Sequence, residues 1–193
     1  MRILFLLCMI ILVPVLLPAQ VQKAGERLSY ASSYQFGMIV GKAYTTYGLQ
    51  MVHGVRYKNY ELGAGVALDP YGFRTIPVFG HLAYVLKPGK SSAYVWGDAG
   101  ASIPWNYGAI PEKQMGTNLE WHKLYSGFYG EAGIGYRIKI DNRSAITFSG
   151  GYSFKRFRYT ENTYVWNGST SSPQKDWYVF DYHRLTFRIG IAF

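Results

Sequence analysis

The fold is decided by the last eleven residues of the chain, His183-Arg184-Leu185-Thr186-Phe187-Arg188-Ile189-Gly190-Ile191-Ala192-Phe193. Odd positions from 185 to 193 are large and apolar, whereas even positions from 184 to 192 are polar or small. This period of two places the two sets on opposite faces of a β-strand. A strand tilted by about 40° climbs about 2.5 Å per residue, so roughly ten residues cross the ~25 Å apolar band of an outer membrane. Polar residues return to the outward face at about that distance, at His183 and Asp181.

The same alternation continues towards the N-terminus. In the neighbouring segment, apolar or small residues occupy even positions from Ile146 to Phe154, and Arg156 and Arg158 follow them. Each segment with this pattern is close to or longer than the roughly 9–11 residues of a tilted membrane strand. The pattern predicts strands at residues 33–42, 47–57, 60–69, 74–86, 92–105, 124–140, 144–160 and 177–193.

The connections between these strands alternate in length. Short turns are expected at 58–59, 87–90 and 141–143, and longer links at 43–46, 70–73, 106–123 and 161–176. Bacterial outer-membrane barrels have short periplasmic turns and longer extracellular loops. The sequence therefore predicts an all-β fold, an eight-stranded antiparallel up-and-down transmembrane β-barrel with that sidedness.

Composition and the N-terminus agree with export. Aromatic residues make up 18% of the 193 residues and charged residues only 16%, against about 25% charged in soluble domains. The short basic N-terminus Met1-Arg2, an apolar run to Leu17 and the small residue Ala19 predict a signal peptide at 1–19, with the barrel at 20–193. An uncleaved anchor is the alternative. The expected location is the outer membrane of a Gram-negative-type cell.

The opposite face of the strands predicts what fills the barrel. An eight-stranded barrel is just wide enough for side chains to fill it, and an unpaired buried charge costs several kcal/mol. We therefore expect a salt-bridged interior rather than an open lumen. The expected members are Arg56, Glu61, His81, Asp98, Glu131, Arg137, Arg184 and Arg188. Counting heights from the periplasmic rim groups them as Arg188 with Asp98 and His81, Glu131 with Arg184, and Glu61 with Arg56 and Arg137.

One external site is expected at the outer rim. Arg156 and Arg158 share the outward face just above the apolar stripe, and His183 lies at a similar height on the neighbouring strand. A guanidinium binds phosphate through a planar fork. These three residues therefore predict contact with lipid headgroups, including lipopolysaccharide. The alternative is a set of ordinary rim charges with no fixed partner.

Two internal segments carry a resemblance to a known family. Ile76-Pro77-Val78-Phe79-Gly80-His81-Leu82 and Ala93-Tyr94-Val95-Trp96-Gly97-Asp98-Ala99-Gly100 are similar to the outer membrane protein beta-barrel domain family, with its PorT-like members. The resemblance implies fold and location, and it carries no catalytic residues. The terminal strand ending at Phe193 also resembles the signal that the outer-membrane assembly machinery reads.

No pattern predicts an enzyme. The four histidines lack ligand spacing such as His-x-x-x-His, and the single cysteine, Cys8, lies in the predicted leader. We expect no catalytic residue, no cofactor, no metal and no nucleic-acid partner. The expected function is a membrane-anchored scaffold whose loops 106–123 and 161–176 contact a protein or glycan. The alternatives are a narrow pore, a lipid A-modifying membrane enzyme and a secreted lipocalin-like binding barrel.

Overall fold

The computed structural model describes residues 28–105, 122–141, 143–166 and 171–193. The predicted signal peptide, 1–19, lies outside these ranges. Within them, no helix is long and apolar enough to cross a membrane. The described residues form nine strands, which are β1 (Ser29–Gly41), β2 (Thr45–Tyr57), β3 (Tyr60–Leu68), β4 (Thr75–Val85), β5 (Ser91–Pro104), β6 (His122–Tyr125), β7 (Gly127–Lys139), β8 (Ala145–Trp166) and β9 (Ser171–Ala192).

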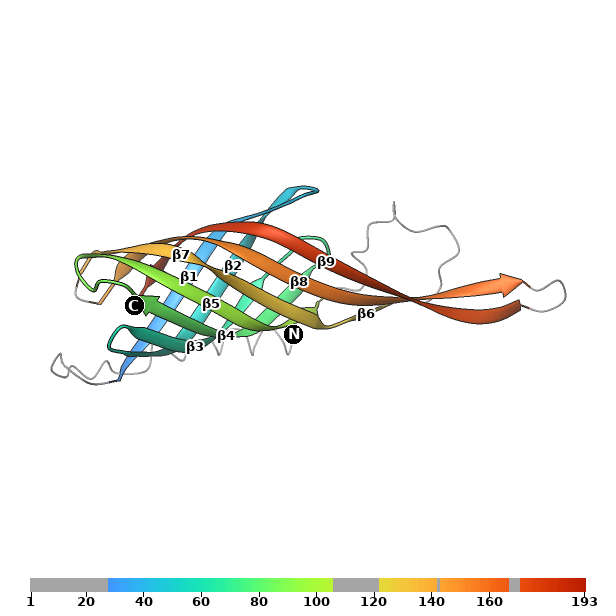
Figure 1. The fold of residues 1–193 in the computed structure, drawn as a ribbon, viewed down its shortest axis with the longest axis horizontal. Helices are drawn as coiled ribbons and strands as arrows, with labels where there is room; N and C mark the ends of the chain where they lie inside the picture. The colour runs from blue at the N-terminus through green and yellow to red at the C-terminus, as the bar shows by residue number, and fades with distance from the viewer. Residues whose placement is uncertain (1–27, 106–121, 142, 167–170) are drawn as a thin grey trace, which may run out of the picture.

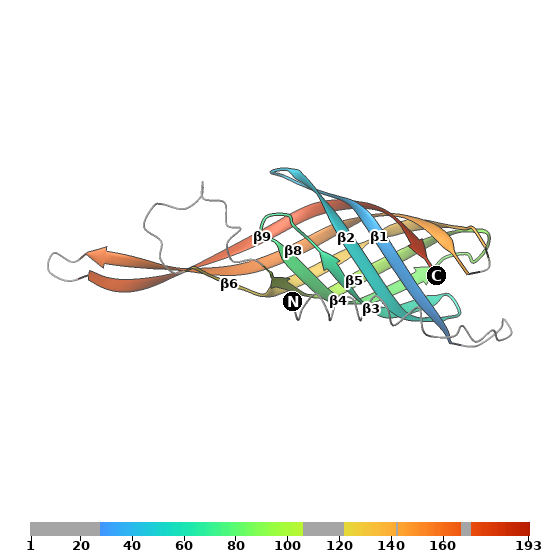
Figure 2. The same ribbon diagram turned by 180° about the vertical axis from the view of Figure 1, so that it is seen from behind.

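Eight of these strands close into a barrel. All pairings are antiparallel, each of β1 to β5 pairs with its sequence neighbour, and β5 continues to β7, β8 and β9. The first and last strands then pair, from Ser33 opposite Ala192 to Gly41 opposite Arg184. Figures 1 and 2 show the closed wall from its two sides. The predicted eight-stranded antiparallel barrel is confirmed, and closure removes the free edges of an open sheet.

The segment expected as one strand at 124–140 is broken by a β-bulge. Tyr125 lies opposite Arg158 and Tyr129 opposite Lys155, so three residues on one side face two on the other. The extra residue changes which parity faces inward, which a period-two reading misses. Gly127 belongs to this bulge. A Cβ there would lie 1.6 Å from the carbonyl oxygen of Arg156, so only glycine fits this backbone approach.

The prediction of a loop at 161–176 is wrong for most of that range. β8 continues to Trp166 and β9 begins at Ser171, so their ladder runs beyond Arg156–Asp181 to the pair Trp166–Ser171. Figures 1 and 2 show the resulting twisted hairpin extending away from the barrel body. Threonine, tyrosine, valine and tryptophan are frequent in this stretch, and such residues favour paired strands. Of the loop expected at 106–123, residues 106–121 lie outside the described residues.

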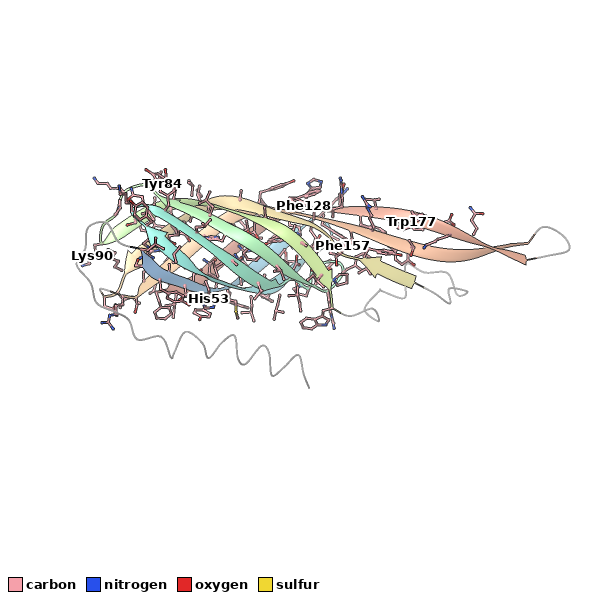
Figure 3. All side chains as sticks on the ribbon, turned by 90° about the horizontal axis from the view of Figure 1, so that it is seen from below. His53, Tyr84, Lys90, Phe128, Phe157 and Trp177 are labelled. Atoms are coloured by element: carbon pink, nitrogen blue, oxygen red, sulfur yellow. The ribbon has the colours of Figure 1, made fainter. Side chains whose placement is uncertain are left out.

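The barrel has an apolar outside and a polar inside. Ile134 is 71% exposed, although it lies in the middle of β7. Figure 3 shows side chains standing outward along the barrel wall. Other exposed apolar side chains on the wall are Phe36, Leu49, Val55, Leu62, Leu82, Val95, Phe148, Leu185, Phe187, Ile189 and Ile191. Buried charged side chains include Glu61, Asp98, Glu131, Lys155 and Arg184.

Candidate functional site in the barrel interior

The first ion-pair cluster lies near the short turns and centres on Glu61. Arg56, directly opposite Glu61 in the β2–β3 ladder, donates from Nε to Oε1 over 2.7 Å. Arg137 reaches from β7, and its Nη1 and Nη2 lie 2.6 and 2.9 Å from the two carboxylate oxygens. One carboxylate therefore accepts three charge-assisted hydrogen bonds from two guanidinium groups. The three residues expected at the bottom of the barrel lie together here.

The second cluster lies at mid-height. His81 and Asp98 face each other across the β4–β5 ladder, with Nδ1 and Oδ1 2.6 Å apart. The Nε2 of Gln50 donates to the other oxygen of Asp98 over 2.8 Å. The partner expected from the height count, Arg188, instead donates from Nη2 to Glu131 over 2.6 Å. The carboxylate of Asp98 is therefore hydrogen-bonded by His81 and by the amide of Gln50.

Glu131 has a different partner from the one expected. It was expected beside Arg184, but its hydrogen bonds come from Arg188 and from the hydroxyls of Tyr129 and Thr186. The height count ignored the stagger between strands. Barrel closure imposes a fixed shear, so side chains that meet in the lumen are offset along the ladder. Because of this shear, side chains at the same counted height on separate strands do not always meet across the lumen.

The third cluster, at the opposite end from the short turns, contains two residues that sequence reasoning missed. The carboxylate of Asp69 lies between Arg184 Nη1 and Lys155 Nζ, the latter at 3.1 Å. Arg184 also donates to Ser153 Oγ over 2.7 Å. The signal for Lys155 was present in the sequence, because it shares the inward parity of β8. Asp69 follows the end of β3, so the alternation of a strand does not predict which way its side chain points.

The connection between β3 and β4 closes this end of the barrel. Lys155 Nζ donates to the carbonyl oxygens of Tyr71 and Phe73, over 2.7 and 3.2 Å. The ring of Tyr71 stacks on Tyr44 with centroids 4.5 Å apart. Phe73 packs edge-on against Phe157, which has no exposed surface. The link expected at 70–73 is therefore an inserted plug, and Lys155 holds it.

Little space remains between the clusters. A cavity of about 10 Å³ lies between the second and third clusters, beside Glu131 and Arg184, and one of about 20 Å³ lies between Gln50 and Arg137. Each is near the minimum volume for a single water molecule. A further cavity of about 20 Å³ lies beside Glu61 and His81, and a larger one, of about 130 Å³, opens at the short-turn end. Among the described residues, no three His, Asp or Glu side chains gather as metal ligands.

The three residues expected to contact lipid headgroups are not equally available. Arg156 is held by Asp181, with two nitrogen–oxygen distances of 2.7 and 2.8 Å. His183 accepts or donates a hydrogen bond with Tyr152. Arg158 is exposed and makes no ion pair within the described part of the chain. Contact with lipopolysaccharide stays a prediction, and the geometry leaves Arg158 as its main cation.

Exposed aromatic side chains lie beside the two loops that were expected to contact a partner. Trp177 lies on the hairpin, is 58% exposed and stacks on Tyr125 with ring centroids 5.5 Å apart. Trp105 is also exposed, directly after β5. Phe193 is half-exposed, and its backbone exchanges two hydrogen bonds with Ser32. These positions are compatible with the expected contacts, which stay predictions.

Comparisons with known proteins give a likeness of fold. No protein-family model matches the chain, and no curated protein matches it. The PorT-like assignment therefore stays a prediction. The crystal structure of the outer membrane protein OprG from Pseudomonas aeruginosa aligns with a TM-score of 0.53 at 10% identity, over 88% of this chain and 98% of that one. The outer membrane protein AlkL, solved in DMPC lipid bilayers, aligns with a TM-score of 0.51 at 11% identity, over 92% and 94%. The chain thus shares the small β-barrel fold of these two proteins.

Proposed function

We propose that the protein is a bacterial outer-membrane barrel that serves as a membrane-anchored scaffold and presents the β8–β9 hairpin at the cell surface. The inverted polarity of the barrel carries the proposal: a wall of exposed Leu, Ile, Val and Phe surrounds an interior of paired charges. A soluble protein rarely exposes so large a contiguous apolar surface. The two structural neighbours are described as outer membrane proteins, which supports the location.

The sidedness follows from the connections. Short turns face the periplasm in bacterial barrels, and here Lys58-Asn59 and 86–90 join strands at one end. The hairpin formed by β8 and β9 extends from the other end. In this orientation the hairpin lies outside the cell. It is the longest described projection from the barrel and therefore the surface that a partner meets first.

The packed interior supports a scaffold over a narrow pore. The three clusters and the plug at 69–74 lie along the lumen, and the two cavities between them hold about one water each. The same packing disfavours a lipocalin-like barrel, which needs an apolar ligand cavity. The proposal includes no catalysis. His53, His81 and His183 each make a hydrogen bond to a tyrosine or an aspartate.

Location and conductance are tested on the purified full-length protein. It should fractionate with outer membranes and change its gel mobility on boiling. In planar bilayers it should give no steady current at modest voltage. Soluble recovery from the periplasm would refute the membrane location. Stable open channels would refute the closed lumen and favour the pore instead.

The scaffold role is tested by crosslinking from living cells. A photoreactive residue replacing Trp177 should give discrete crosslinked species, because Trp177 is exposed on the hairpin. The matched control is the same residue at Lys87, in the short-turn region at the other end. Equal products from both positions, or none from Trp177, would contradict presentation by the hairpin.

Lipid-headgroup contact is the second part of the proposal. Because Arg156 is already paired with Asp181, Arg158→Ala should release more co-purifying lipopolysaccharide than Arg156→Ala does. The double variant should release the most and should still shift on boiling. Unchanged lipid retention in the double variant would show that the rim charges have no fixed lipid partner.

A further inference from the structure

One described cavity lies outside the packed lumen, at the short-turn end of the barrel. Its volume is about 130 Å³, roughly ten times the ~10–15 Å³ that a cavity needs to hold one water. It lies between the end of β2, the β4–β5 turn and the β7–β8 turn. Figure 3 marks this end of the barrel with Tyr84 and Lys90. We call this cavity the basal cavity.

The lining of the basal cavity is strongly basic. Its cationic residues are Arg56, Lys58, Arg137, Lys139 and Arg143. Asp141 is the one acidic residue among the described lining residues, and Glu61 lies behind them against Arg56 and Arg137. The terminal carboxylate of Phe193 also lines the cavity, so five cations against three carboxylates leave an excess of two positive charges. Low-dielectric walls focus such a field into the cleft.

All three carboxylates already accept hydrogen bonds, that of Phe193 from the backbone N–H of Ser32 over 3.1 Å. Asp141 Oδ1 accepts the backbone N–H groups of Arg143 and Ser144, over 2.6 and 2.7 Å, and so closes the β7–β8 turn. Both oxygens of Glu61 are occupied by Arg137, and one also by the Nε of Arg56. Within the described residues, the terminal nitrogens of Arg56 have no partner, and its side chain is 34% exposed. The terminal N–H groups of Arg56 therefore lie at the cavity as free donors.

We propose that the basal cavity is an anion site that binds a phosphate group. The free fork of Arg56 matches the geometry of phosphate oxygens, and Lys58, Lys139 and Arg143 add point charges around it. The volume accommodates a small tetrahedral anion. The phosphate can belong to a lipid headgroup of the inner leaflet or to a soluble periplasmic phosphate. Both sources offer the same chemistry to the cavity.

Inorganic phosphate is the probe for the site. Full-length protein in a phosphate-free maltoside detergent is titrated with phosphate and followed by ³¹P NMR and calorimetry. Wild type should bind one phosphate saturably, and more weakly as salt rises. Arg56→Gln should weaken binding about tenfold or more, because a hydrogen bond to a charged group is lost. Glu61 keeps both bonds from Arg137, so this variant should fold and shift on boiling.

Lys87→Gln is the matched control. Lys87 is exposed in the β4–β5 turn next to the cavity, carries the same charge and does not line it. Its removal should leave phosphate affinity unchanged. An equal loss in both variants would overturn the site in favour of diffuse rim charge. Absence of saturable binding to wild type would overturn it as well.

A competition experiment separates the two sources. If a short-chain phosphatidic acid displaces bound phosphate at a lower concentration than glycerol phosphate does, the natural ligand is a lipid headgroup. If glycerol phosphate competes equally well, the site takes a soluble phosphate. Both results support the site, whereas displacement of phosphate by neither compound would overturn it.

Discussion

The two ends of the lumen contain the same set of charges in opposite surroundings. At the long-connection end, Asp69 pairs with Lys155 and Arg184, whose side chains are 0% and 1% exposed. At the short-turn end, Glu61 pairs with Arg56 and Arg137, and Arg56 remains 34% exposed. Each cluster has one carboxylate and two cations. The clusters differ in the groups that accept hydrogen bonds from the second cation.

At the long-connection end, backbone carbonyl oxygens accept the hydrogen bonds of the second cation. Lys155 donates to the carbonyls of Tyr71 and Phe73, and the rings of the same loop exclude water. At the short-turn end, no described carbonyl accepts from Arg56, and the basal cavity stays open. The first arrangement is a seal, because both cations pair with Asp69 inside the protein and only Arg184 Nε lacks a hydrogen-bond partner there. The second leaves hydrogen-bond donors for a ligand. Four predictions follow from this contrast.

The largest effect is expected for Asp69→Asn. It leaves Lys155 and Arg184 buried without a counter-charge, which costs about 3–5 kcal/mol of folding free energy. Urea titration followed by the gel shift on boiling measures it. Glu61→Gln should cost less, since Arg56 can turn to water. Equal losses in the two variants would remove the distinction between the ends.

A smaller loss is expected for Lys155→Met. The apolar chain keeps most of the volume, but the carbonyls of Tyr71 and Phe73 lose a donor, at a cost of about 1–3 kcal/mol. Hydrogen exchange should rise at 69–75 and stay unchanged in β1–β2. Unaltered exchange at 69–75 would mean that aromatic packing alone holds the plug.

Arg56→Gln should cost less than about 1 kcal/mol of folding free energy, as is usual for a partly exposed ion pair. Urea titration beside Arg184→Gln, its counterpart in the sealed cluster, provides the measurement. The Arg184 variant should lose several times more, because Asp69 is then left buried with a single cation. A large loss in Arg56→Gln would show that the short-turn end is as tightly packed as the other.

The smallest effect concerns Asp141 in the β7–β8 turn. Hydrogen bonds from the backbone N–H groups of Arg143 and Ser144 hold its pKa below the usual 3.8. A lowered carboxyl pKa stabilises the fold above the ordinary value, and this contribution disappears as pH falls through the lower pKa. Carboxyl ¹³C NMR should therefore show Asp141 titrating below 3.8. Asp141→Asn should matter at neutral pH and lose its effect in acid.

Strand number, the inward-facing set and the apolar belt were readable from the sequence, because side-chain direction in a strand depends only on local parity. Parity placed Glu61, Asp98, Glu131 and Arg188 inside the barrel, where the structure also has them. It could equally have indicated Lys155. The expected strand boundaries at 57, 60 and 105 lie within one residue of the observed ones at Tyr57, Tyr60 and Pro104.

Only the tertiary structure determined which side chains contact each other. Barrel shear pairs Glu131 with Arg188 instead of Arg184, and shear is a property of closure that no single strand contains. The bulge at Gly127 depends on the carbonyl of Arg156 in another strand. Asp69 enters the lumen only because its loop folds inward onto Lys155. The basal cavity arises in the same way, because two separate chain segments, 56–58 and 137–143, bring five cations to one mouth. Local periodicity specifies a face, whereas register, shear and loop closure are non-local and specify the partner.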